Sequence, residues 1–302
     1  MSLELSVPDL ADAATRERFQ AVANAATAVD GYPPFNEQTM LDLAEGRRTP
    51  LLISVGDSPV GAAVLGQGEL DLVVAPAHRG RGHGGEALRQ ILADVPDDLT
   101  AWSHGDHPAA RVLANRFRMA AARTLLQLRL SLTREPLTDA DQAPDLAAPA
   151  AAAPGVVINA FRPGADDTEW LALNALIFAQ HPEQGSLTGD DLAARKAEPW
   201  FEAGDFLIAR NEATGTMIGY NWLKLEPDLP TGEIYVIGVH PDAAGRGLGR
   251  SLMLAGVERI RDRGRSAATL YVEAHNAPAV NLYRSLGFTD HTIDVQYRRL
   301  PQ

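Results

Sequence analysis

The sequence predicts an α/β fold with two domains in tandem, each built on a central mixed sheet (α+β in its strand order) with helices on both faces. Two segments of the chain repeat one another, and in each of them hairpin-linked strands precede a strand–turn–helix–strand unit. A stretch rich in Pro, Ala and Asp separates the two segments. With 302 residues, 45% of them hydrophobic, the chain is long enough for two such domains.

The repeat is clearest around a glycine-rich turn. The segment GELDLVVAPAHRGRGHGGEAL begins at Gly68, and GEIYVIGVHPDAAGRGLGRSL begins at Gly232. In each copy a strand-like run ends near a proline, glycines follow, and an apolar-periodic run then predicts a helix. We expect an N-terminal domain over residues 1–135, a Pro/Ala-rich linker over 136–154 and a C-terminal domain over 155–302.

The remaining elements follow the same order in both halves. Apolar runs with turn signals between them predict strand pairs before each glycine turn, TPLLISV with SPVGAAVL and GDFLIAR with GTMIGYNWLKL. After the glycine-turn helix, each half has a further strand, at 99–103 and at 268–273. A helix with Pro-Ala near its start follows, in DHPAARVLANRF and in NAPAVNLYRSLGF. Antiparallel hairpins followed by a βαβ unit predict a mixed sheet.

Composition limits the classes of partner. The formal net charge is −12 and the isoelectric point is about 5.1, which argues against nucleic acid or an anionic membrane as a partner. The absence of cysteine excludes disulfides, thiol nucleophiles and thiolate metal sites. The N-terminal stretch has charges where a signal peptide needs an apolar core, so we expect a cytoplasmic protein, and we treat it as a monomer.

The glycine turn has the properties of an anion-binding site. Glycines at 245, 247 and 249 lie between a predicted strand and a predicted helix, where backbone N–H groups at the helix N-terminus can point at an anion. The turn lacks the Gly-Lys-Ser/Thr ending of a P-loop and the GxGxxG spacing of a dinucleotide fold. An ordinary tight connection is the alternative, but the copy at 80–85 favours binding.

Together these motifs resemble the GCN5-related N-acetyltransferases. The resemblance is carried by Val239-His240-Pro241, by Gly245–Gly249 and by the run from Asn276 through Tyr283 to Phe288. It implies that the turn binds the pyrophosphate of acetyl-CoA, the acetyl donor, with no metal. Ala244 departs from the family, which usually has Gln or Arg there. The residues that the resemblance assigns to acetyl-CoA are Leu72, Val73, Val74, Gly80, Arg81, Gly82, His83, Gly84, Gly85, Ile237, Gly238, Val239, Ala244, Gly245, Arg246, Gly247, Leu248, Gly249, Arg250, Asn276, Ala277, Pro278, Ala279, Val280 and Asn281.

The tandem arrangement narrows the resemblance to the mycothiol synthase family. FAQHPEQG at 178–185, NWLK at 221–224 and LYVEAHN at 270–276 are similar to that family. The resemblance implies acetyl transfer to the cysteine amine of a cysteinyl-glucosaminyl-inositol, a small-molecule partner that lies between the two domains. It places that acceptor against five residues, Glu37, Glu183, Lys224, Glu233 and Tyr271. Each of these could instead be an exposed charge or a packed ring.

The two halves differ at the residues that chemistry needs. Counting seven residues from Asn276 and from Asp106 gives Tyr283 and Leu113, so only the C-terminal half has a phenol that can protonate the departing thiolate. Glu233 is eight residues before Pro241, but Glu69 is only seven before Pro76. The missing residue should place Glu69 on the opposite face, and the longer copy should contain a β-bulge. We expect the N-terminal half to bind acetyl-CoA without turning it over.

These residues suggest direct transfer, with Glu233 as general base, amides near Val239 polarising the thioester, and Tyr283 as general acid. Tyr283 could instead be a packed core side chain. An aminoglycoside, a polyamine or a protein N-terminus would suit the same acidic site, and a non-catalytic acetyl-CoA-binding module is a third alternative. His104 and His107 have metal-like spacing but lie in a loop without a third ligand, so no metal is expected.

Overall fold

The structure is a computed structural model that describes residues 2–95, 98–133, 153–179 and 184–300. Contacts divide the chain into two compact units. Unit 1 contains Met1–Leu126, Glu273–His275 and Thr292–Gln302, and unit 2 contains Gln127–Val272 and Asn276–His291. Most of the predicted linker lies outside the described residues, so the predicted domain boundaries stay predictions.

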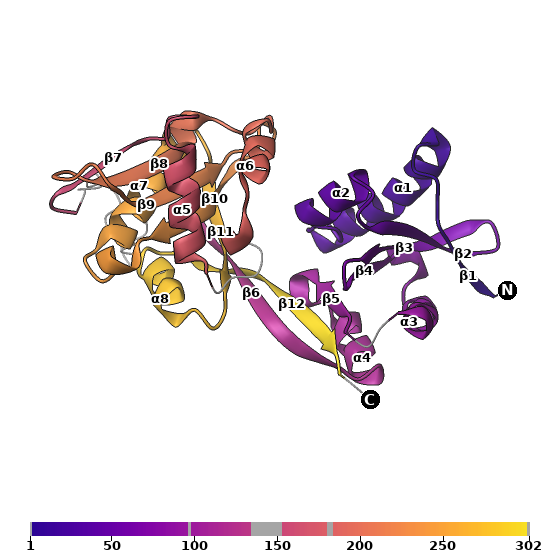
Figure 1. The fold of residues 1–302 in the computed structure, drawn as a ribbon. Helices are drawn as coiled ribbons and strands as arrows, with labels where there is room; N and C mark the ends of the chain where they lie inside the picture. Colours follow the sequence, from indigo (N-terminus) through magenta and orange to yellow (C-terminus); the bar gives the residue numbers. More distant parts are fainter. Residues whose placement is uncertain (1, 96–97, 134–152, 180–183, 301–302) are drawn as a thin grey trace. The chain divides into compact units, whose positions relative to one another are not determined.

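Unit 1 is a mixed sheet with a helix layer on each face (Figure 1). Its strands lie in the order β1 (Leu3–Ser6), β2 (Thr49–Val55), β3 (Ser58–Gly66), β4 (Glu69–Val74), β5 (Thr100–Ser103) and β12 (Thr289–Arg299). Among the strand pairs described in this unit, only β4–β5 is parallel. The helices are α1 (Ala13–Asp30), α2 (Glu37–Ala44), α3 (His83–Asp94) and α4 (Pro108–Arg116).

The two faces of β3 explain the layering of unit 1. Successive side chains of a strand point to opposite faces. Ala62 and Val64 pack against α1 through Phe19 and its neighbours. Ala63, between them, packs against the apolar side of α3, which includes Leu88. The expected cover of helices on both faces is therefore confirmed in this unit.

Unit 2 repeats this plan. Its strands are β7 (Val156–Ala160), β8 (Phe206–Asn211), β9 (Met217–Lys224), β10 (Thr231–Val239) and β11 (Ala267–Glu273), with β6 (Met119–Ser131) beside β11. Again only the central pair, β10–β11, is parallel among the strand pairs described within β7–β11. The helices are α5 (Asp167–Ile177), α6 (Gly189–Lys196), α7 (Leu248–Asp262) and α8 (Ala277–Ser285).

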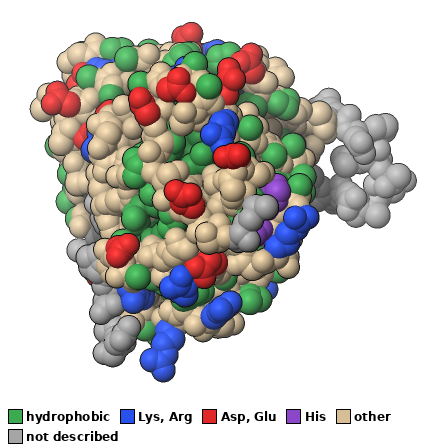
Figure 2. Space-filling model, turned by 90° about the vertical axis from the view of Figure 1, so that its right-hand side faces the viewer, with side chains coloured by type: hydrophobic (Ala, Val, Ile, Leu, Met, Phe, Trp, Pro, Cys, Tyr) green, Lys and Arg blue, Asp and Glu red, His purple; other side chains and the backbone are tan. Residues whose placement is uncertain are grey.

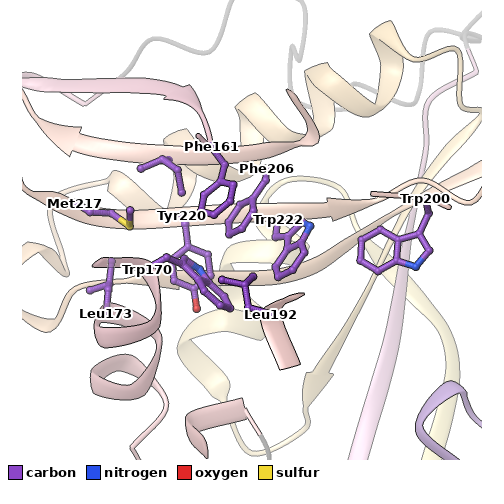
Figure 3. Packing of buried hydrophobic residues seen from close by; sticks show 10 residues of the cluster. Phe161, Trp170, Leu173, Leu192, Trp200, Phe206, Met217, Tyr220 and Trp222 are labelled. Carbon is purple, nitrogen blue, oxygen red and sulfur yellow. The ribbon is translucent and has the colours of Figure 1, made fainter. Parts of the chain in front are cut away.

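An aromatic core fills the α5 face of unit 2 (Figure 3). Trp170 on α5 meets Phe206, Tyr220 and Trp222 edge to face, with ring centres 5.5–5.6 Å apart. Such rings contribute more than their buried area alone. Ala209 on the opposite face packs with Leu248 and Leu252 of α7. The two faces of β8 and β9 thus fix α5 and α7 on opposite sides of the sheet.

Candidate active site

The glycine turn after β10 leads directly into α7. Gly245 and Gly247 have φ values of +75° and +83°, which is the left-handed region that glycine adopts without strain. Gly247 caps the helix, and no side chain caps its first N–H groups. By contrast, α8 begins with a side-chain cap, in which Asn276 Oδ1 accepts from Ala279 N at 3.3 Å. The turn at residues 245–249, called the cradle below, thus presents uncapped helix N–H groups that could hold an anion.

Unit 1 contains the same turn before α3. Gly80 and Gly82 have φ values of +74° and +84°. Gly82 caps α3 without a side-chain contribution, as Gly247 caps α7. The residue before the turn differs, because Arg79 takes the place of Ala244. Its guanidinium binds the Asp30 carboxylate at 2.6 and 2.7 Å and the Val74 carbonyl at 3.0 Å.

The parallel strands beside each cradle separate before they end. In unit 2, the described β10–β11 ladder runs from Thr231 opposite Ala267 to Ile234 opposite Leu270. The rest of β10, up to Val239, continues to pair with β9. Alternate residues direct their backbone groups to opposite neighbours, so this stretch also has groups directed to the β11 side. The described β4–β5 ladder is shorter still, with Glu69 and Leu70 paired to Thr100 and Ala101.

A β-bulge lies in β10, as the spacing predicted. Ile234 is opposite Leu223 and Val236 is opposite Trp222, so Tyr235 is the extra residue. The β3–β4 ladder has no such shift from Gly61 opposite Val74 to Gly66 opposite Glu69. The predicted bulge is confirmed.

The predicted face change of Glu69 is wrong. Glu69 lies opposite Gly66 and Thr100, and Glu233 occupies the same ladder position opposite Lys224 and Thr269. The bulge absorbs the additional residue of β10, so both glutamates keep the same register.

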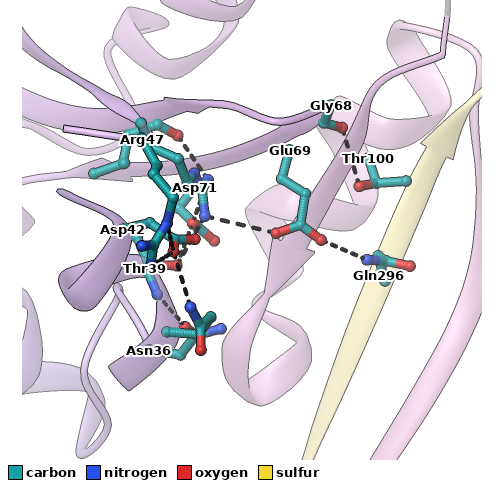
Figure 4. A network of polar contacts seen from close by, with 12 residues as sticks. Asn36, Thr39, Asp42, Arg47, Gly68, Glu69, Asp71, Thr100 and Gln296 are labelled. Atoms are coloured by element: carbon teal, nitrogen blue, oxygen red, sulfur yellow. Dashed lines mark hydrogen bonds and ion pairs between the residues drawn. The ribbon is translucent and has the colours of Figure 1, made fainter. Parts of the chain in front are cut away.

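The side chain of Glu69 lies beside a network of polar groups (Figure 4). Arg48 Nη1 lies 3.6 Å from the Glu69 carboxylate, and Gln296 Nε2 donates to it at 3.3 Å. Arg48 is 3% exposed and also binds Asp71 at 2.8 Å and the Thr39 hydroxyl at 3.0 Å. A buried ion-pair network therefore lies beside the glutamate of the N-terminal copy.

Tyr283 lies on α8 and is 7% exposed, with its ring centre 6.2 Å from that of Phe288. Burial raises the pKa of Tyr283 to about 12. The phenol therefore stays protonated over the physiological range, as a proton donor must.

The counterpart of Tyr283 in unit 1 is Ala114, so the pairing with Leu113 is wrong. Helices α4 and α8 both have nine residues, and aligning their ends places Leu113 with Leu282. A Cβ atom on Gly84 would lie 3.6 Å from Leu113, and one on Gly249 would lie 3.5 Å from Leu282. The proline is the first residue of α4 but the second of α8, which shifted the count by one. Alanine has no hydroxyl group, so the N-terminal half still lacks the proton donor at this position.

The predicted acceptor residues are described to different extents. Lys224 and Glu233 are cross-strand partners in unit 2. Tyr271 is 47% exposed on β11, and its hydroxyl accepts from Gln127 Nε2 at 2.9 Å. Glu37 is the first residue of α2, which Asn36 caps by accepting from Thr39 N at 2.8 Å, but the side chain of Glu37 is outside what the structure describes. Glu183 lies outside the described residues.

Two residues near this site were missed by the sequence analysis. The Lys224 ammonium lies 5.3 Å from the ring centre of Trp200 and 5.8 Å from that of Tyr235. The one-residue excess of β10 was the signal for Tyr235, because that residue is the bulge. No local signal marks Trp200, which approaches from the segment before β8.

The loop histidines have structural contacts. His104 Nδ1 lies 2.9 Å from Asp294 Oδ2, and Gly105 N donates to Asp294 Oδ1 at 2.9 Å. His107 caps α4 by accepting from Ala109 N. Within the described residues, no group of three or more His, Asp or Glu side chains could hold a metal ion.

None of the helices in the described part of the chain combines the length and apolar character needed to cross a bilayer. On the face that Figure 2 shows, Asp and Glu side chains are spread among apolar ones, and the Lys and Arg side chains lie singly or in small groups.

Comparison with known proteins gives consistent matches. A family model described as the acetyltransferase (GNAT) family matches residues 170–288. The chain is 44% identical over 295 residues to a mycothiol acetyltransferase of Thermobispora bispora, covering 94% of this chain and 96% of the relative. It is 46% identical over 289 residues to the mycothiol acetyltransferase of Clavibacter sepedonicus, covering 92% and 90%.

Solved structures are similar in fold. A tandem GNAT protein from the clavulanic acid biosynthesis pathway has a TM-score of 0.69 at 20% identity and covers 100% of both chains. A GCN5-related N-acetyltransferase from Sphaerobacter thermophilus has a TM-score of 0.68 at 21% identity, covering 98% of this chain and 95% of that one. At these identities the likeness concerns the fold, which both units share.

Proposed function

The chain belongs to the mycothiol acetyltransferases, a family of acetyl-CoA-dependent N-acetyltransferases, and from that premise we propose its acceptor and its catalytic residues. The proposed reaction is acetyl transfer to the cysteine amine of a cysteinyl-glucosaminyl-inositol, which gives mycothiol. The observation that carries this proposal is the arrangement of unit 2, in which a glycine cradle and the separating β10–β11 pair lie at the same end of β10 as Val239.

We propose that residues 244–250 hold the diphosphate of acetyl-CoA and that Ile237, Gly238 and Val239 lie along its pantetheine arm, with the first turn of α8 from Asn276 to Asn281. A diphosphate is a delocalised anion, so backbone N–H groups and a helix N-terminus suit it without a lysine. The end of β10 from Val236 to Val239, which pairs with β9 beyond the described β10–β11 ladder, supports this. The glycine at 238 is explained by packing, because a Cβ atom there would lie 2.9 Å from Ile177 and 3.1 Å from the Tyr220 ring.

Glu233 is the proposed general base. The α-amine of the acceptor has a pKa near 8 and is largely protonated at neutral pH, so it must lose a proton before it attacks. Glu233 takes that proton directly or through a water molecule. Backbone amides of β10 near Val239 stabilise the negative charge that develops on the thioester oxygen. Acetyl-CoA supplies the activated acetyl group.

Tyr283 is the proposed hydrogen-bond donor to the leaving sulfur. Complete proton transfer from a phenol with a pKa of about 12 to a thiolate with an ordinary thiol pKa of about 8.5 is uphill by about 5 kcal/mol. We therefore assign most of its effect to hydrogen bonding while negative charge grows on the sulfur. This role requires a donor that stays protonated, which the burial of Tyr283 supports.

The acceptor is proposed to bind Glu37, Glu183, Lys224, Glu233 and Tyr271. Carboxylates accept hydrogen bonds from hydroxyls and from an ammonium group, which suits a cationic amine attached to a polyol. The matched ladder position of Lys224 and Glu233 supports the pair in unit 2.

Unit 1 is proposed to bind acetyl-CoA without turnover, through Leu72, Val73, Val74 and residues 80–85. Its cradle supports binding, and Ala114 together with the Arg48–Glu69 ion pair argues against catalysis. Glu86 lies in the first turn of α3, and hydrogen bonds from Arg89 and Gln90 lower its pKa to about 2. The Glu86 carboxylate is paired with the Arg89 guanidinium, and Ser251 has the corresponding place in unit 2.

The test is an assay of the purified protein with acetyl-CoA and the cysteinyl-glucosaminyl-inositol acceptor. The acetylated product is followed by mass spectrometry, because the acceptor has its own thiol and would obscure a thiol reagent. Acetylation of that acceptor supports the proposal. Acetylation of a polyamine, an aminoglycoside or a peptide N-terminus in its place would favour the second candidate, an acetyltransferase for another amine.

A further inference from the structure

The ammonium group of Lys224 lies close to two aromatic rings. Its Nζ atom is 5.3 Å from the ring centre of Trp200 and 5.8 Å from that of Tyr235, within the range in which a ring face attracts a cation. The two rings meet edge to face at 63° with centres 5.3 Å apart. The Glu226 carboxylate lies 3.1 Å from the ammonium, and the lysine side chain is 10% exposed. The charge is thus held against rings as well as beside a carboxylate.

Tyr235 is itself fixed on several sides. As the bulge residue of β10, it has no counterpart in β4. Its ring meets Trp222 at 88° with centres 5.7 Å apart (Trp200 and Trp222 are labelled in Figure 3). Its hydroxyl accepts from Arg195 Nε at 3.2 Å. A bulge redirects side chains locally, and here it aims a ring at a cation.

In unit 1 a different residue supplies the positive charge near the corresponding glutamate, Glu69. Gly66 occupies the ladder position of Lys224, and a Cβ atom there would lie 3.0 Å from Arg48 Cα. The cation near Glu69 is Arg48, whose guanidinium binds Asp71, Thr39 and the Val64 carbonyl. Those contacts fix the direction of its N–H groups. In the C-terminal copy the cation lies against two ring faces, and a ring face attracts charge without fixing the direction of an N–H donor.

We infer that Tyr235 and Trp200 are positioning residues that hold the ammonium of Lys224, the residue opposite Glu233 in the ladder, for recognition of the acceptor's hydroxyl groups. This inference rests on the proposed function, in which Lys224 binds the acceptor. Without the rings the lysine side chain regains rotamer freedom and its ammonium spends less time at this position. Tyr235→Leu should therefore raise KM for the acceptor about tenfold, with little change in kcat or in KM for acetyl-CoA.

Tyr235→Phe is the matched control, because it keeps the ring and removes only the hydroxyl bonded to Arg195. It should stay within about twofold of the wild-type KM. Trp200→Phe also keeps an aromatic ring and should keep KM for the acceptor close to the wild-type value. Trp200→Leu should raise KM for the acceptor as Tyr235→Leu does. If these residues had a purely structural role, the leucine substitutions would lower the amount of folded protein, and they would not raise KM for the acceptor while leaving kcat unchanged.

A direct readout uses the two lysines of the chain, Lys196 and Lys224. With ¹³C-labelled lysine, the ε-CH₂ signal of Lys224 should be shifted upfield by the two rings. Lys196, which binds Asp167 at 2.5 Å, is the internal reference. Tyr235→Leu should move the Lys224 signal toward its unstructured position, and Tyr235→Phe should leave it in place.

The outcomes separate this inference from the proposed function. An unchanged Lys224 signal in Tyr235→Leu, or an unchanged KM for the acceptor, overturns the positioning role. If Lys224→Met leaves KM for the acceptor unchanged, the acceptor-binding role of Lys224 is wrong, whereas the lysine signal still decides whether the rings hold the ammonium.

Discussion

Glu233 lies directly across the β9–β10 ladder from Lys224, one position before the residue at which the bulge begins. We expect Glu233→Gln to lower kcat by about 10²- to 10⁴-fold, because the amide cannot accept the amine proton. Steady-state kinetics between pH 6 and 9 would measure it, and a loss below tenfold at every pH would contradict the assignment of Glu233 as base.

Tyr283→Phe removes one hydroxyl from a buried ring and should leave the fold intact. We expect kcat to fall about 10²-fold or more, with KM for acetyl-CoA little changed, because the lost hydrogen bond forms as charge develops on the sulfur. Adding Leu113→Tyr to this variant should restore nothing, since Leu113 corresponds to Leu282. Recovery of turnover in the double variant would show that unit 1 has a competent site.

The two cradles can be tested with one pair of substitutions. Gly247→Ala places a Cβ at φ +83°, which costs about 1–2 kcal/mol although the surrounding space is open. We expect KM for acetyl-CoA to rise about 5- to 30-fold as the helix N-terminus adjusts. Gly82→Ala in unit 1 should leave turnover unchanged and weaken a second binding event. Kinetics and calorimetric titration measure the two effects, and equal loss of turnover in both variants would contradict the division of roles.

Asp205 joins the start of β8 to the end of α7. It is fully buried, and its oxygens accept from Arg259 Nε at 2.7 Å and Arg263 Nη1 at 2.8 Å. Asp205→Ala should lower the free energy of unfolding by about 3 kcal/mol, since two guanidinium groups lose their carboxylate. Urea unfolding followed by tryptophan fluorescence reports it. Asp262→Ala, at an exposed position on the same helix, should change stability by less than about 0.5 kcal/mol.

The contact between His104 and Asp294 predicts a pH-dependent stability of unit 1. Burial alone would lower the pKa of His104, but the hydrogen bond and charge of Asp294 outweigh burial and raise it above 6.5. A raised histidine pKa stabilises the folded state fully below the unfolded value and loses this effect as pH rises through the folded value. The stability difference between wild type and His104→Gln should therefore be larger at pH 6 than at pH 9. An NMR titration that places the His104 pKa below 6.5 would refute it.

The sequence predicted much of the architecture because the relevant signals are local. Glycines between a strand and a helix specified the two cradles, and their φ values agree between copies within a degree. The count between Glu233 and Pro241 predicted the bulge, because a strand must accommodate an extra residue somewhere. The chemistry of Glu233 and Tyr283 could be proposed from residue type and spacing for the same reason.

Counting residues along the chain gave wrong correspondences between the two halves where the exact ends of helices or the position of a bulge had to be known. The proline offset between α4 and α8 is invisible until the helix ends are seen, so Leu113 was matched to Tyr283 in place of Ala114. The face of Glu69 was mistaken because the effect of a bulge on register depends on where in the strand it occurs.

The amino-acid order by itself determined the repeated plan, the two glycine turns, and which half keeps a tyrosine, since these depend on neighbours within one turn or strand. Only the tertiary structure decided that Arg48 lies beside Glu69 and that Trp200 and Tyr235 enclose Lys224. Such contacts join distant segments through the packing of a sheet against its helices, and no local pattern encodes which side chains that packing brings together.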